Sequence, residues 1–127
     1  MRFMMLVKGD ADYEAGTPIE PALIEAIGRL AEEGLRNGTL VEQGGLLPSA
    51  AGARVKVEGG TVRVIDGPFT EARELVGGFA VIEAASKAEA IEMGAAFMRL
   101  HADILGPSYV GELEIRQMFE APPCTTA

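Results

Sequence analysis

The chain has 127 residues, of which 48% are hydrophobic and 24% charged, the balance of one ordinary globular domain. Its 19 acidic and 11 basic side chains give a net charge of −8, which disfavours binding to nucleic acids and to anionic membranes. The single cysteine, Cys124, allows no disulfide within the chain, and the N-terminal residues lack the long apolar region of a signal peptide. We therefore expect a cytoplasmic protein without a membrane anchor.

The first part of the chain is predicted to form a strand, a helix and a second strand. Residues 3–7 are apolar on both faces, as in a central strand that is covered on both sides, and residues 9–16 are polar and turn-rich, as in a loop. A helix with one apolar face begins at or a few residues before Pro21 and ends at Asn37-Gly38. Residues 40–47 are expected to hold a short strand.

A β-hairpin is predicted in the middle of the chain. Residues 54–58 and 61–65 alternate between apolar and polar side chains, and Gly59-Gly60 joins them. Two alternating segments separated by two glycines favour a tight turn with positive backbone angles.

The last part of the chain repeats the order of strand, helix and strand. Residues 76–83 read as a buried strand, Ser86 and Glu89 have the spacing of a capping box at the start of a helix, and residues 113–119 alternate as a final strand. Without the hairpin, the order is βαββαβ, so the predicted fold is α+β of the ferredoxin-like type with an inserted hairpin. Such a sheet has helices on one face only.

The other face of this sheet is expected to be apolar as well. We assign Met4, Leu6, Ala80 and Ile82 to it. An apolar sheet face needs a cover, and a second copy of the chain is the simplest one, so we predict a homodimer.

Several segments in the expected order resemble one protein family. They are Met4–Lys8, Gly44–Ser49, Gly52–Val55, Asp66–Glu71, Glu74–Phe79, Ser86–Glu92 and Glu114–Glu120. Together they are similar to the YCII-related proteins of the branch named after the Asp-Gly-Pro-Phe motif. The resemblance covers roughly residues 1–120, so we expect a single domain over residues 1–121 and a flexible tail over residues 122–127.

This resemblance implies a dimeric α+β barrel, in which two ferredoxin-like sheets pack face to face. A catalytic role has been proposed for the family from a paired His and Asp, and relatives occur beside or fused to sigma factors. The first predicted helix here contains no histidine, so that pair cannot be carried over. A sigma-factor-related partner is one further expectation from the resemblance.

The Asp66-Gly67-Pro68-Phe69 segment is the first candidate site. We hypothesise that it shapes a wall of the main cavity, where Asp66 acts as a general base or ligand acceptor and Gly67, Pro68 and Phe69 contact a ligand. The alternative is a structural turn, in which the Asp66 carboxylate accepts a backbone N–H.

His101 is the second catalytic candidate, because an imidazole can carry protons near neutral pH; the alternative is a hydrogen-bonded histidine of the core. Glu114 and Arg116 are expected to point between the two sheets of a dimer, where they bind a polar ligand or form an ion pair across the interface.

No metal or cofactor is expected, because one histidine and one cysteine cannot supply a zinc site and no glycine-rich nucleotide motif is present. Three functions remain open: an acid/base enzyme acting on a small polar molecule, a non-catalytic small-ligand or regulatory module, and a protein-interaction domain of sigma-factor-type transcription control. A binding cavity would favour the first two, whereas an exposed apolar patch beyond the dimer face would favour the third.

Overall fold

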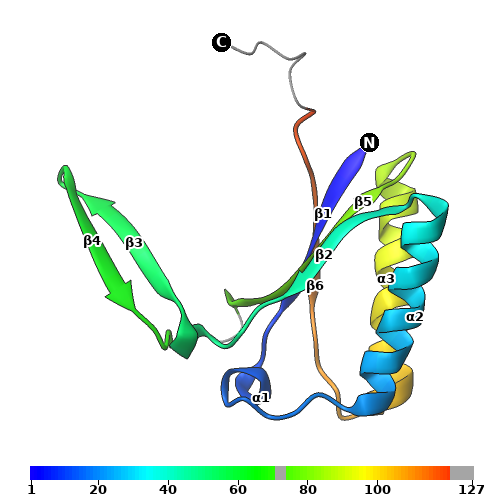
Figure 1. Ribbon diagram of the computed structural model, residues 1–127, viewed down its shortest axis with the longest axis horizontal. Coiled ribbons are helices and arrows are strands. Elements are labelled where there is room, and N and C mark those ends of the chain that lie inside the picture. The colour runs from blue at the N-terminus through cyan, green and yellow to red at the C-terminus, as the bar shows by residue number, and fades with distance from the viewer. Residues whose placement is uncertain (71–73, 121–127) are drawn as a thin grey trace.

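Strand β1 (Arg2–Lys8) lies inside a four-stranded sheet with the order β2-β5-β1-β6 (Figure 1). The other strands are β2 (Leu40–Gly45), β5 (Val76–Glu83) and β6 (Leu113–Gln117), and every neighbouring pair is antiparallel. This computed structural model describes residues 1–70 and 74–120. Helices connect β1 to β2 and β5 to β6, so the predicted α+β, ferredoxin-like βαββαβ order is confirmed.

Both long helices begin where the sequence predicts a helix start. Helix α2 (Pro21–Asn37) has proline at its first position, and Gly38 ends it with a φ of 81°. Helix α3 (Lys87–Leu105) follows the N-cap Ser86, whose Oγ accepts a hydrogen bond from the Glu89 backbone N–H at 3.1 Å. The two helices cover the same side of the sheet (Figure 1).

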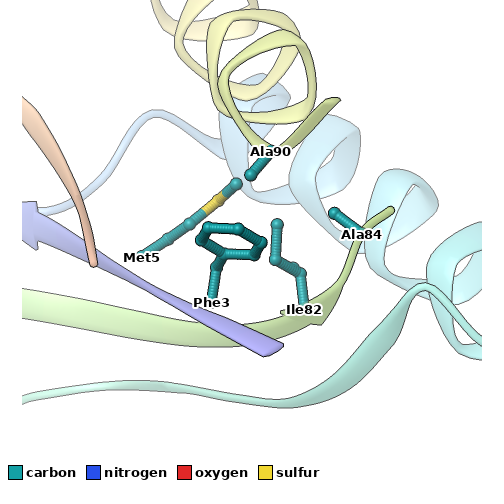
Figure 2. Close-up of a cluster of buried hydrophobic side chains, with 5 residues drawn as sticks. All are labelled: Phe3, Met5, Ile82, Ala84 and Ala90. Atoms are coloured by element: carbon teal, nitrogen blue, oxygen red, sulfur yellow. The ribbon is translucent and has the colours of Figure 1, made fainter. Parts of the chain in front are cut away.

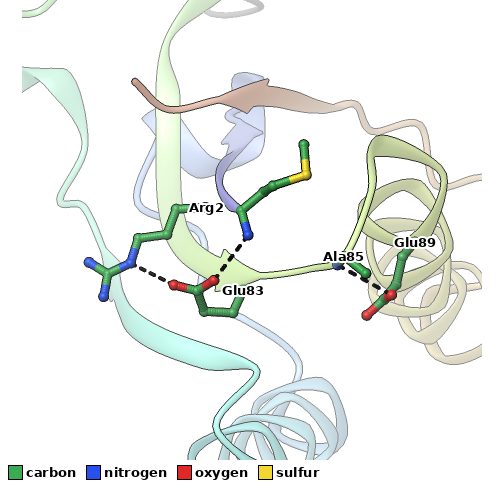
Figure 3. A network of polar contacts seen from close by, with 5 residues as sticks. Arg2, Glu83, Ala85 and Glu89 are labelled. Atoms are coloured by element: carbon green, nitrogen blue, oxygen red, sulfur yellow. Dashed lines mark hydrogen bonds and ion pairs between the residues drawn. The ribbon is translucent and has the colours of Figure 1, made fainter. Parts of the chain in front are cut away.

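The start of α3 and the adjoining end of the sheet are joined by further polar contacts (Figure 3). The Glu89 carboxylate accepts from the backbone N–H of Ala85 at 3.3 Å, one residue before the N-cap that a capping box would use. Nearby, the Glu83 carboxylate binds Arg2 Nε at 2.8 Å and the N-terminal ammonium of Met1 at 3.4 Å. These ion pairs are exposed.

The core lies between the sheet and α3. It consists of the buried side chains Phe3, Met5, Ile82, Ala84 and Ala90, which Figure 2 shows pointing toward one another from β1, the end of β5 and α3. Phe3 faces Ile82, and Met5 faces Ala80, across the β1–β5 pair. These alternate residues therefore mark the face of the sheet that the helices cover.

The opposite face is apolar at its centre, but two of its predicted members were wrong. Met4 pairs with Val81 and Leu6 pairs with Phe79, so these four side chains share the face away from the helices. Ala80 and Ile82 lie on the helix side, because β5 pairs with β1 so that Ala80 is opposite Met5 and Ile82 is opposite Phe3.

The predicted hairpin is confirmed and stands away from the rest of the molecule (Figure 1). Strands β3 (Ala53–Glu58) and β4 (Thr61–Asp66) pair only with each other in the described sheet topology, and Gly59 and Gly60 have φ angles of 57° and 78°. One hairpin face carries four valines that are between 63% and 73% exposed: Val55, Val57, Val62 and Val64.

The predicted loop at residues 9–16 contains a short helix instead, and a second short helix precedes the hairpin. Residues 9–16 hold α1 (Ala11–Glu14), because the Asp10 carboxylate caps it by accepting from the Tyr13 backbone N–H at 2.8 Å. A single 3-10 turn, η1 (Ser49–Ala51), precedes the hairpin. The predicted tail over residues 122–127 lies outside the described residues. Within residues 1–70 and 74–120, none of the helices has both the length and the apolar character needed to cross a membrane.

Candidate functional site

A cavity of about 1040 Å³ lies between the helices and the sheet. Its walls come from β1, β2 and β5, from α2 and α3, from residues 9–20 with the short helix α1, and from residues 108–110. Most of the wall is aliphatic or aromatic: Met5, Val7, Leu23, Ile27, Leu30, Leu40, Met93, Phe97 and Leu113 all contribute. The volume reaches the upper end of the range for small-molecule sites, and the mixture of apolar wall and few polar groups is typical of them.

His101 is the most deeply buried polar side chain in this wall, at 7% exposed. Helix α3 holds its ring in place, because Nδ1 lies 3.0 Å from the Phe97 carbonyl oxygen one turn earlier. A carbonyl oxygen only accepts, so Nδ1 carries the proton and Nε2 of the neutral ring has a free lone pair. The Phe97 ring packs edge-on against the imidazole with centroids 4.8 Å apart.

Tyr109 also packs against the imidazole. Its ring stacks on His101 with centroids 5.6 Å apart and planes inclined by 27°. Burial, and secondarily the negative charge of Asp10, raises the pKa of the Tyr109 hydroxyl above its usual value. The phenol therefore stays protonated at neutral pH, and it can donate a hydrogen bond into the cavity that it lines.

A second tyrosine, Tyr13 of α1, joins this cavity to the start of β5. Its hydroxyl donates to the Gly77 carbonyl oxygen at 3.0 Å, so this donor is already used. Burial and the nearby Glu14 carboxylate raise the pKa of Tyr13. Tyr13 thus fixes the short helix over the cavity.

The Asp66–Phe69 segment lies elsewhere, at the base of the hairpin. None of its four residues lines the cavity under the helices. The exposed Asp66 carboxylate makes no hydrogen bond or ion pair with any residue in the ranges 1–70 and 74–120, so the proposed turn acceptor is not seen there. The hypothesis that this segment shapes a ligand site now concerns only a cavity formed with a second copy.

Backbone and serine contacts fix this segment instead. The Ser49 hydroxyl donates to the Glu14 carboxylate and accepts from the Phe69 backbone N–H at 2.9 Å, which ties α1, η1 and the segment together. Gly67 donates its N–H to the Gly52 carbonyl oxygen at 3.0 Å, and the Gly67-Pro68 peptide bond is cis. The Arg54 guanidinium lies 3.9 Å over the Phe69 ring centroid.

Glu114 and Arg116 lie on the sheet face away from the helices, as their pairing with Leu6 and Met4 shows. The Arg116 guanidinium is 3.1 Å from Glu114 Oε2, and the Lys8 ammonium is 3.3 Å from Glu114 Oε1. Arg116, and after it Lys8, lowers the pKa of the Glu114 carboxyl by hydrogen bonding. Whether they meet a ligand or a second copy there stays a prediction.

Comparison with known proteins bears on the family. The model of the YCII-related domain matches residues 1–105, from β1 to the end of α3. The chain belongs to the YCII-related family. A search of curated proteins gives no match. The match ends before β6, although β6 pairs with β1 and completes the sheet of this YCII-related protein.

Sequence reasoning found His101 but missed Tyr109, which stacks on it. Helix α3 ends at Gly106, and the chain then turns so that Tyr109 packs against His101 of the same helix. No periodic pattern in the sequence predicts this contact. In the described residues, no group of three His, Cys, Asp or Glu side chains is arranged to hold a metal ion. His101 and Tyr109 are the polar side chains whose rings the structure stacks together in the cavity wall.

Proposed function

We propose that this YCII-related protein binds a small, largely apolar molecule in the cavity under its helices. The observation that supports this proposal most strongly is a nearly buried histidine in the wall of a largely apolar cavity of about 1040 Å³. A cavity with apolar walls and a few polar groups that set the orientation is the usual form of a ligand site. The sequence predicted a small polar ligand between two sheets, whereas the walls seen here favour a mainly apolar one.

Acid/base catalysis in this cavity would depend on His101. Its Nε2 can take a proton from a bound substrate, and the Phe97 carbonyl oxygen keeps Nδ1 protonated and the ring oriented. Asp66 does not line the same space, so it would not assist. The geometry of the cavity supports ligand binding directly, whereas catalysis would also require proton transfer by His101.

Two neighbouring alanines of α3 offer a sharp test. Ala96 lines the cavity and Ala95 does not, and both are exposed. Wild type and the variants Ala95→Trp and Ala96→Trp are incubated with cell extract, repurified and examined by native mass spectrometry. We expect a small molecule on wild type and on Ala95→Trp but not on Ala96→Trp. Equal retention by both variants, or no retained molecule on wild type, would contradict the proposal.

A second function, association with another copy of the chain, is favoured by the hairpin. A two-stranded hairpin is marginally stable alone in water, yet this one exposes a face of four valines. The sheet face around Met4 and Phe79, which points away from both helices, is a further apolar surface, and these two side chains are half-buried. We propose that both are covered in a homodimer, with the sheet faces together and the valine face against the partner.

Sedimentation equilibrium at micromolar concentration tests this assembly. Wild type should be a dimer, and the double variant Val57→Lys/Val62→Lys should weaken it. The control Lys56→Glu/Arg63→Glu changes the opposite face of the hairpin and should leave the dimer intact. A monomeric wild type would refute the dimer. A dimer unaffected by the valine variants would leave that face for a different protein, such as the sigma-factor-type partner that the resemblance implies.

A further inference from the structure

His101 and Tyr109 each place in the cavity wall a polar atom that has no partner among the described residues. His101 Nε2 and the Tyr109 hydroxyl make no hydrogen bond within the described part of the chain, and neither is among buried atoms that lack a partner. Each atom therefore keeps surface that a solvent molecule can reach, and both residues line the cavity. One of them offers a lone pair and the other an O–H, side by side on stacked rings.

The charged residues that line the same cavity are almost all negative. There are five carboxylates and one ammonium: Asp10, Asp12, Glu20, Glu33, Glu89 and Lys8. The ammonium is already paired, since Lys8 Nζ lies 3.3 Å from Glu114 Oε1. An anion that enters this cavity therefore meets repulsion, whereas a neutral or cationic molecule does not.

We infer that the ligand is an uncharged or cationic, largely apolar molecule with an O–H or N–H group, which donates to His101 Nε2. This inference rests on the proposed binding function and names the class of molecule that the site takes. A phenol, an aromatic alcohol or an amine fits, because each combines an apolar body with a donor. The Tyr109 hydroxyl then donates to the same oxygen, or accepts a second N–H from an amine. A carboxylate or phosphate does not belong to this class.

Three probes of nearly equal size separate the effect of a hydrogen-bond donor on binding from the effect of a negative charge. Para-cresol has a donor, para-methylanisole has the same ring without a donor, and para-toluate carries a negative charge. Isothermal titration calorimetry on the full chain should give para-cresol an affinity about three- to tenfold above that of para-methylanisole, the range that one hydrogen bond supplies. Para-toluate should bind most weakly, and added salt should narrow its disadvantage because salt screens the carboxylates.

Two variants assign the preference to the histidine. His101→Leu removes the acceptor and should give para-cresol and para-methylanisole equal affinity, while His101→Gln keeps an acceptor and should retain part of the preference. The comparison of probes on wild type stands even if His101→Leu does not fold. Equal binding of para-cresol and para-methylanisole by wild type, or tightest binding of para-toluate, would overturn this inference and leave the binding function standing. No binding of any probe would overturn both.

Discussion

Replacing Gly67 with alanine tests what holds the base of the hairpin. A Cβ at this position would lie 1.8 Å from the Ser49 carbonyl oxygen and 2.7 Å from the Ser49 carbonyl carbon. These are backbone atoms, which cannot rotate away as a side chain can, so η1 or the Asp66–Phe69 segment must move. That movement also strains the Gly67 N–H bond to the Gly52 carbonyl oxygen. We expect a loss of about 2 to 3 kcal/mol, the upper part of the range for overpacking.

Gly52 provides the matched control, because it approaches the same Ser49 carbonyl oxygen. A Cβ there would lie at 3.5 Å, an ordinary contact, and its backbone is extended with a φ of −111°. Gly52→Ala should therefore be neutral or stabilise by about 0.5 kcal/mol through the unfolded chain. Urea unfolding followed by circular dichroism measures both. Equal stabilities of the two variants would refute the steric account of this segment.

Three other outcomes follow from the core, the ion pairs and the absence of a predicted metal site. Phe3→Ala should cost about 3 to 5 kcal/mol in urea unfolding, because Phe3 is 2% exposed at the centre of the core; a loss below about 1 kcal/mol would place the core elsewhere. Hydrogen bonds from Arg2 to Glu83 and from Arg116 to Glu114 lower the pKa of both carboxyls below the ordinary 4.5. These lowered pKa values stabilise the fold above the ordinary pKa of 4.5, and the stability is lost as the pH falls through the lowered pKa. A Glu83→Gln/Glu114→Gln variant should therefore lose less stability than wild type when the pH is lowered. Equal loss of stability by the two proteins would contradict this role of the ion pairs. Chelator treatment should leave the melting temperature unchanged, and a large drop would reveal a missed metal site.

The sequence was sufficient for the fold because its signals are local. Pro21, the Ser86 cap and Gly59-Gly60 each mark a boundary through backbone chemistry, and the structure confirms each of them. The composition of the uncovered sheet face was partly missed, because register depends on pairing between distant strands. Ile82 could be assigned to either face until its pairing with Phe3 was known.

The site was less accessible to sequence reasoning for the same reason. His101 stood out as the one histidine, but its partner Tyr109 reaches it only through the turn after α3. The cavity itself follows from how far α2 and α3 stand from the sheet, which no local pattern specifies. The Asp66–Phe69 motif drew attention because its residue types are unusual, and the structure places it at the hairpin base rather than in this cavity.

Nitrogen NMR of the imidazole tests the central claim most directly, since the chain contains a single histidine and labelled histidine reports on it alone. The account predicts a neutral ring protonated at Nδ1, because Nδ1 donates to the Phe97 carbonyl oxygen, with Nε2 unprotonated and open to the cavity. Addition of para-cresol should then shift the Nε2 resonance, and para-methylanisole should shift it much less. A ring protonated at Nε2, or an Nε2 resonance that saturating para-cresol leaves unchanged, would contradict the claim that His101 receives a ligand in this cavity.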